Sequence, residues 1–199
     1  MKRRDAIKNI GLAAGFAAIS PSIFSMLQSC TTDAETWTPS YLTSDEKTVV
    51  TSLVDIIIPK TSSTPAATEV GVPQFIDKYI LEVLNPKDQQ ITRAAFNKII
   101  TLLKPDNESQ LSNLTSQQYK TLLDDHMFLN NETDPEREEN PEMEGMTSSE
   151  FLNQLKWMTI FAYKNSEEVG ENILAYDPIP TAYYCGDLTE LTGGKSYSL

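Results

Sequence analysis

Cysteine, histidine and glycine are scarce in this chain of 199 residues, and each scarcity excludes a class of site. Two cysteines, Cys30 and Cys185, and one histidine, His126, are too few for a Cys/His zinc site, and no C-x-x-C-H motif for attached haem occurs. The eight glycines form neither G-x-G-x-x-G nor G-x-x-x-x-G-K, so no Rossmann or P-loop phosphate site is expected. We expect this chain to hold neither a metal ion nor a cofactor of its own.

Residues in catalytic patterns are also scarce. His126 follows Asp124 and Asp125, which would suit an acid–base histidine with a carboxylate partner. Adjacent residues on a helix do not face each other, however, so we interpret His126 as a surface or half-buried residue. No serine lies in G-x-S-x-G. We therefore expect no catalytic residue in this chain.

Basic residues are few: 16 Lys and Arg stand against 28 Asp and Glu, for a net charge of -12. Four of the basic residues and one acidic residue lie in the first 29 positions, so the rest carries 12 against 27, or -15. A surface this negative repels nucleic acid, and we expect no nucleic-acid partner. Residues 130–146 read as a long acidic surface loop, and its carboxylates lack the EF-hand spacing that a calcium site would need.

The first 29 residues have the architecture of an export signal. A basic start containing Arg3 and Arg4 precedes an uncharged run from Ile10 to Leu27. The sequence R-R-D-A-I-K resembles the twin-arginine motif, whose pathway moves folded proteins. The alternatives are an ordinary secretion signal and an uncleaved membrane anchor, although serines and a proline interrupt the run.

The run ends in Leu-Gln-Ser-Cys, which resembles a bacterial lipobox with Cys30 as the acceptor of the lipid. We interpret residues 30–41 as a lipidated, polar tether, which would hold the protein on the periplasmic side of a bacterial membrane. The alternative is a buried or disulfide-bonded Cys30. If Cys30 is acylated, Cys185 is left as a buried thiol or as one that pairs between chains.

Helical periodicity dominates the remaining chain. Capping boxes begin at Thr43, Thr115 and Thr147, each with Glu or Gln three residues later. With the apolar spacing and the prolines, they predict an all-α fold, a single domain over residues 42–199 with about five helices and long loops. The expected helices span about 44–58, 73–84, 86–104, 116–128 and 148–164, and residues 166–174 form a turn or a short helix.

The apolar stripes of these helices should face the core. Among the residues expected inside are Phe75 and Val83 in the second helix, Leu102 in the third and Phe161 in the fifth.

The tail is proline-punctuated and should lie on the surface. Its tyrosines, Tyr176, Tyr183 and Tyr184, are candidates for a partner interface, because aromatic residues are enriched there. The alternative is that they pack on the chain's own core.

Several short motifs carry a family resemblance. With the twin-arginine start, these are the segment from Leu42 to Pro59 ending in D-I-I-I-P, the sequence G-V-P-Q-F-I-D at residues 71–77, and A-Y-D-P-I-P at residues 175–180. The chain resembles the gluconate 2-dehydrogenase subunit 3 family over most of residues 42–188. The resemblance implies a non-catalytic small subunit whose large partner, an FAD-dependent oxidoreductase of the glucose-methanol-choline type, oxidises a sugar or sugar acid. It also implies that a cytochrome c takes the electrons and that the small subunit carries the export signal for its folded partner.

Three functions remain open from the sequence. The first is an accessory subunit that exports, tethers and stabilises such a dehydrogenase. The second is a stand-alone, membrane-anchored lipoprotein interaction module. The third, an enzyme in its own right, would need a site that none of the searched motifs provides.

Overall fold

The computed structural model describes residues 37–104, 110–128, 132–177 and 185–198. The chain divides into two compact units, residues 1–38 and 39–199, and the described helices belong to the second. The predicted export signal with Arg3 and Arg4, the lipid-acceptor Cys30 and most of the tether lie outside the described residues.

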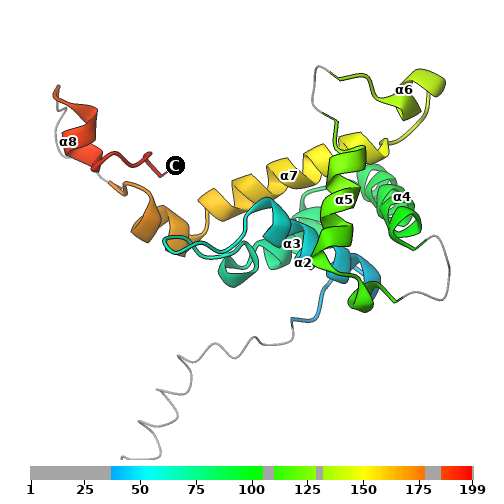
Figure 1. The fold of residues 1–199 in the computed structure, drawn as a ribbon, viewed down its shortest axis with the longest axis horizontal. Coiled ribbons are helices and arrows are strands. Elements are labelled where there is room, and N and C mark those ends of the chain that lie inside the picture. The colour runs from blue at the N-terminus through cyan, green and yellow to red at the C-terminus, as the bar shows by residue number, and fades with distance from the viewer. Residues whose placement is uncertain (1–36, 105–109, 129–131, 178–184, 199) are drawn as a thin grey trace, which may run out of the picture. The chain divides into compact units, whose positions relative to one another are not determined.

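The second unit is a single helical domain, as predicted (Figure 1). Its α-helices are α2 (Ser44–Ile57), α3 (Val72–Glu82), α4 (Pro86–Leu103), α5 (Ser116–His126), α6 (Pro135–Glu139), α7 (Ser148–Lys164) and α8 (Leu188–Thr192). Two 3₁₀ turns, η1 (Thr68–Val70) and η2 (Leu111–Asn113), and the π-helix η3 (Glu168–Ile173) complete the list. Across the described ranges the only extended pairing is a bridge between Ala175 and Tyr197.

The five expected helices are confirmed, and the capping boxes explain where three of them begin. At α2 and α7 the threonine and the glutamate exchange hydrogen bonds; Thr147 Oγ1 accepts from the Glu150 amide at 3.0 Å, for example, and the Thr147 amide donates to Glu150 Oε2 at 3.0 Å. At α5 the Gln118 side chain accepts from the Thr115 amide at 2.9 Å. These bonds satisfy amides that the first helical turn leaves without partners.

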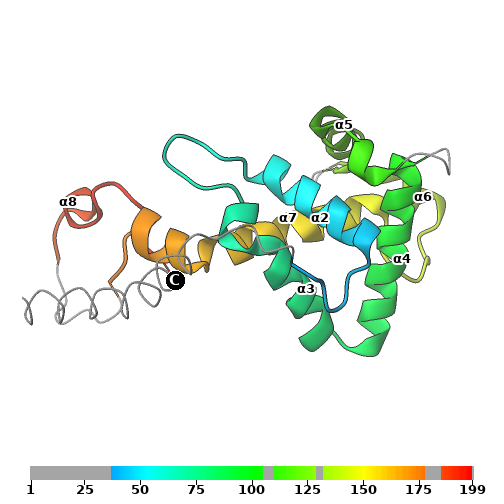
Figure 2. The same cartoon turned by 90° about the horizontal axis from the view of Figure 1, so that it is seen from below.

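Helix α2 is the centre of the core. It packs against α3, α4, α5 and α7, and in Figure 2 it lies between α3 and α5. Its side chains Val49, Val50, Leu53 and Val54 are fully buried. On the other side of the core the rings of Phe96 on α4 and Phe151 on α7 meet edge to face, with centroids 4.7 Å apart.

Several residues expected in the core are exposed instead. Phe161 is 51% exposed and Phe75 is 37% exposed, and Val83 and Leu102 also face outward. In each helix they lie at the edge of an apolar stripe that is wider than the contact surface of the neighbouring helices. A buried helix side can therefore be predicted from periodicity, but the width of the buried stripe cannot.

The acidic loop prediction for residues 130–146 needs correction, because the described part of this segment contains α6. Asp134 caps α6 by accepting the Glu136 amide at 3.0 Å, and Pro135 occupies the first helical position. The sequence Asp-Pro-Glu carried this helix-start signal. Helix α8, η1 and η2 were also missed, since each is too short to produce a periodic pattern.

Candidate functional site

The first residues of the folded domain are held by a buried carboxylate of α3. Asp77 is 0% exposed and accepts three consecutive backbone amides: Ser40 at 2.7 Å, Tyr41 at 2.9 Å and Leu42 at 2.8 Å. A buried carboxylate is costly unless it is hydrogen-bonded, and here both of its oxygens have amide donors. The chain is therefore fixed to the domain at residues 40–42, where the expected tether ends.

Arg93 of α4 fastens the same segment from a second side. Its guanidinium lies over the Tyr41 ring, 4.1 Å from the centroid, and donates to the Tyr41 carbonyl at 3.0 Å. It also forms an ion pair with Glu46, a buried residue of α2. The Tyr41 hydroxyl donates to the Gln89 carbonyl at 2.8 Å, and burial raises the pKa of that hydroxyl above its usual value. We call Asp77, Arg93, Glu46 and Tyr41 the tether clamp.

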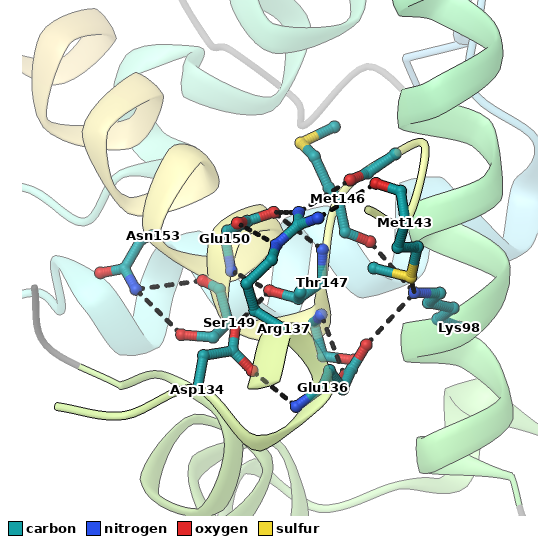
Figure 3. Close-up of polar contacts among 12 residues, drawn as sticks. Lys98, Asp134, Glu136, Arg137, Met143, Met146, Thr147, Ser149, Glu150 and Asn153 are labelled. Atoms are coloured by element: carbon teal, nitrogen blue, oxygen red, sulfur yellow. Dashed lines mark hydrogen bonds and ion pairs between the residues drawn. The ribbon is translucent and has the colours of Figure 1, made fainter. Parts of the chain in front are cut away.

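A second polar cluster ties the acidic segment to the domain (Figure 3). Arg137 of α6 reaches Glu150 in the first turn of α7 through two bonds, Nε to Oε1 at 3.1 Å and Nη2 to Oε2 at 2.6 Å. The same guanidinium donates to the carbonyls of Met143 and Gly145, each at 3.0 Å. This two-point geometry fixes the orientation of α6 as well as its position.

Lys98 of α4 holds the other side of this cluster. Its ammonium is 3.2 Å from Glu136 Oε2 and donates to the Met146 carbonyl at 3.1 Å, as Figure 3 shows. Glu136 Oε1 also accepts the Ser148 amide at 3.1 Å. Partial burial alone would raise the pKa of Glu136, but the bonds from Ser148 and Lys98 outweigh it and hold that pKa below its usual value. The Arg137 and Thr147 bonds likewise outweigh burial and lower the pKa of Glu150.

Four other carboxylates of this segment are exposed: Glu138, Glu139, Glu142 and Glu144. Among the residues that the structure describes, no group of three or more His, Cys, Asp or Glu side chains could hold a metal ion. The arrangement can orient a charged surface, and it brings no reactive groups together.

A third feature is a face of aromatic side chains on α3 and α7, of which three are exposed and Tyr79 is half-buried. Phe75 stacks on Tyr79 of the same helix, with centroids 6.0 Å apart, and touches Phe161 of α7 at 6.1 Å. Trp157, one helical turn before Phe161, is 68% exposed. We call Phe75, Tyr79, Trp157 and Phe161 the aromatic face.

A shallow hollow of about 460 Å³ lies between α2 and α5, lined by Ser52, Asp55 and Tyr119 among others. The Asp55 carboxylate accepts the amide and the hydroxyl of Thr68, at 2.9 and 2.8 Å. The hollow therefore contains a carboxylate that already serves to fix η1.

Comparison with known families shows which family the chain belongs to. The model of the family described as gluconate 2-dehydrogenase subunit 3 matches residues 44–180, which is well over half of the chain. The chain belongs to this family. The matched span runs from the start of α2 to past the π-helix, so it contains the acidic segment and the aromatic face. No curated protein and no solved structure matches the chain.

The family description names one subunit of a dehydrogenase, so family members are by name parts of a multi-chain enzyme. The function of such a subunit is therefore to be sought on its surface, where another chain could bind, as well as in its cavities. Among the helices that the structure describes, none is long and apolar enough to span a bilayer.

Of the residues singled out from the sequence, the structure describes three: Tyr176, His126 and Cys185. Tyr176 follows the Ala175 bridge and is half exposed, whereas Tyr183 and Tyr184 lie outside the described residues. His126 is the last residue of α5 and is half-buried. Cys185 is an exposed free thiol, which corrects the expectation that it could be buried.

Sequence reasoning missed the tether clamp, and it placed Phe75 and Phe161 of the aromatic face in the core. Asp77 did carry a signal, because a carboxylate on the side of α3 that also holds Ile76 and Ile80 must have buried donors. The aromatic face had none, since Phe75 and Phe161 fit an apolar stripe as well as core residues do.

Proposed function

We propose that this chain is the non-catalytic accessory subunit of a periplasmic, FAD-dependent sugar or sugar-acid dehydrogenase. Membership of the gluconate 2-dehydrogenase subunit 3 family is the observation that carries the proposal. The FAD and the catalytic residues belong to a large partner of the glucose-methanol-choline type, and a cytochrome c accepts the electrons. The role of this chain is to export, tether and stabilise that partner.

The export role rests on the twin-arginine-type start. A partner that must fold around FAD before crossing the membrane needs a route for folded proteins. Arg3 and Arg4 would direct that route for both chains, because the partner would travel bound to this one.

The tethering role rests on Cys30 and on the clamp. Ten residues, 30–39, separate the expected lipid from the first amide that Asp77 holds. A fully extended chain spans about 3.3–3.6 Å per residue, so this tether reaches roughly 35 Å at most. Because the clamp fixes residues 40–42 to α3 and α4, tension on the tether would be borne by buried hydrogen bonds and an ion pair.

The test is a mild-detergent pull-down of the tagged chain from its native membranes, read by mass spectrometry and flavin absorbance. We expect a flavoprotein of the glucose-methanol-choline type to co-purify. A colourless, solitary chain would overturn the accessory role and leave the stand-alone interaction module.

Two variants separate export from tethering. Replacing Arg3 and Arg4 by Lys should leave the partner's dehydrogenase activity in the cytoplasm, and normal periplasmic activity would contradict the export role. Cys30→Ser should release active complex from the membrane into the soluble periplasmic fraction. Cys185→Ser is the matched control and should leave the complex on the membrane.

A further inference from the structure

The aromatic face on α3 and α7 is not explained by the stability of this chain. Trp157 is 68% exposed and Phe161 is 51% exposed, so most of the apolar area of these side chains stays in water. Scattered apolar residues are normal on a surface, but here Phe75 contacts both Tyr79 and Phe161. A cluster of touching exposed aromatic rings is typical of an interface.

The two helices that carry the rings are held in place before any partner binds. The rings project from two long helices, α3 and α7, which pack against each other. Ring stacking between Phe75 and Tyr79 further limits the rotamers of both residues. The chain would therefore lose little side-chain entropy by ordering these residues on binding. Trp and Tyr are also the residue types that most often dominate the binding energy of an interface.

Helix α7, which carries Trp157 and Phe161, differs in charge from the whole protein. Residues 151–166, nearly all of α7, contain no Asp or Glu and two lysines, Lys156 and Lys164, although the net charge of the chain is -12. Lys78 of α3 lies one turn after Phe75 and is exposed, and the exposed Glu82 lies one turn after Tyr79. Within the described part, neither Lys78 nor Lys164 forms an ion pair.

This charge pattern disfavours a second copy of the chain on the face. A twofold interface brings the same patch against itself, which would place lysines opposite lysines. Residues 31–36 of the tether are no better a cover, because they read Thr-Thr-Asp-Ala-Glu-Thr and contain no large apolar side chain. A membrane surface is disfavoured by the strongly acidic remainder of the protein.

We propose that the aromatic face binds the catalytic large subunit, through an apolar hollow on that subunit with carboxylates at its rim. The inference rests on the proposed function for the existence of this partner and adds the surface that binds it. Trp157 and Phe161 are its anchors, and Lys78, Lys156 and Lys164 meet the rim.

The experiment is the same pull-down from cells that carry the double variant Trp157→Ala and Phe161→Ala in the full chain. We expect at least tenfold less flavoprotein per captured chain, with the Tm of the purified variant within about 3 °C of wild type, because both side chains are mostly exposed. Leu102→Ala, an exposed apolar residue of α4, is the matched control and should recover normal flavin.

The charge contribution has its own pair of variants. Lys156→Glu with Lys164→Glu should reduce recovery severalfold, and the reduction should become smaller as salt is raised. Lys120→Glu, an exposed lysine of α5, makes a comparable change elsewhere and should have no effect.

Failure of the inference and failure of the proposed function are distinguishable. If wild type recovers the flavoprotein and the double aromatic variant recovers it equally well, the inference is wrong and the accessory role stands. If wild type recovers none, the proposed function itself fails.

Three results would assign the face to something other than the large subunit, and each would overturn the inference. A dimer of wild type that becomes a monomer in the double variant would assign the face to a second copy. A large fall in Tm would show that another part of this chain packs on the face. Loss of binding to vesicles of phosphatidylglycerol and phosphatidylethanolamine, with flavin recovery unchanged, would assign it to the membrane.

Discussion

Replacing Asp77 by Asn tests whether the clamp holds the start of the domain. The substitution keeps the size of the side chain, and the remaining oxygen can still accept the Tyr41 and Leu42 amides. These two bonds lose the assistance of a full charge, and the new NH₂ group opposes the Ser40 amide, which currently donates at 2.7 Å. The variant therefore weakens two bonds and removes a third.

The expected cost follows from those three changes. A hydrogen bond to a charged acceptor contributes about 1.5–3 kcal/mol and a neutral one about 0.5–1.5, so two weakened bonds cost roughly 2 kcal/mol together. The lost Ser40 bond adds about 1 kcal/mol, since the exposed Ser40 can turn its amide to water. A total of about 3 kcal/mol lowers the Tm of a domain this size by roughly 6–12 °C.

The assay is thermal unfolding followed by circular dichroism, together with hydrogen exchange of the Ser40, Tyr41 and Leu42 amides. These amides should exchange much faster in the variant. Asp124→Asn, an exposed aspartate of α5, is the control, and its stability should change by less than about 0.5 kcal/mol. A Tm within 2 °C of wild type, with the three amides still protected, would refute the reasoning.

Two further predictions concern the ion pairs. Arg93→Met leaves the buried Glu46 carboxylate without its cation and should destabilise the domain by about 2–4 kcal/mol in urea unfolding, whereas Arg93→Lys should cost less. The folded-state pKa values of Glu136 and Glu150 lie below their unfolded values, so the stability that these groups add is complete above pH ~5 and is lost as the pH falls through the folded pKa values. Urea unfolding should show a decline from pH 5 to pH 3 that Glu136→Gln with Glu150→Gln makes shallower; an unchanged slope would contradict this.

The helices could be read from the sequence because their signals are local. Thr43, Thr115 and Thr147 each begin a helix with a partner three residues away, and such a bond forms whatever the rest of the chain does. Periodicity likewise identified the buried side of α2, whose neighbours cover it completely.

The features that were missed depend on long-range contacts. Asp77 finds its donors 35–37 residues earlier in the chain, and Lys98 finds Glu136 38 residues later. The spacing of apolar residues cannot predict such long-range pairs, so the sequence of residues 130–146 indicated only a loop. Phe161 was misplaced for a related reason, because an interface residue and a core residue have the same composition and spacing.

Helix α3 connects the two features on which the proposed role depends. Asp77 faces inward and holds residues 40–42, while Phe75 and Tyr79 of the same helix belong to the outward aromatic face. On the two proposals above, one rigid helix therefore joins the membrane tether to the catalytic partner. Asp77→Asn should then leave flavoprotein recovery unchanged well below the Tm, since the outward rings keep their packing on α7. Thermal release of the flavoprotein should follow the lowered Tm of the variant. If release kept the wild-type temperature, binding would not depend on the folded state of α3, and the aromatic face would not be the site that holds the partner.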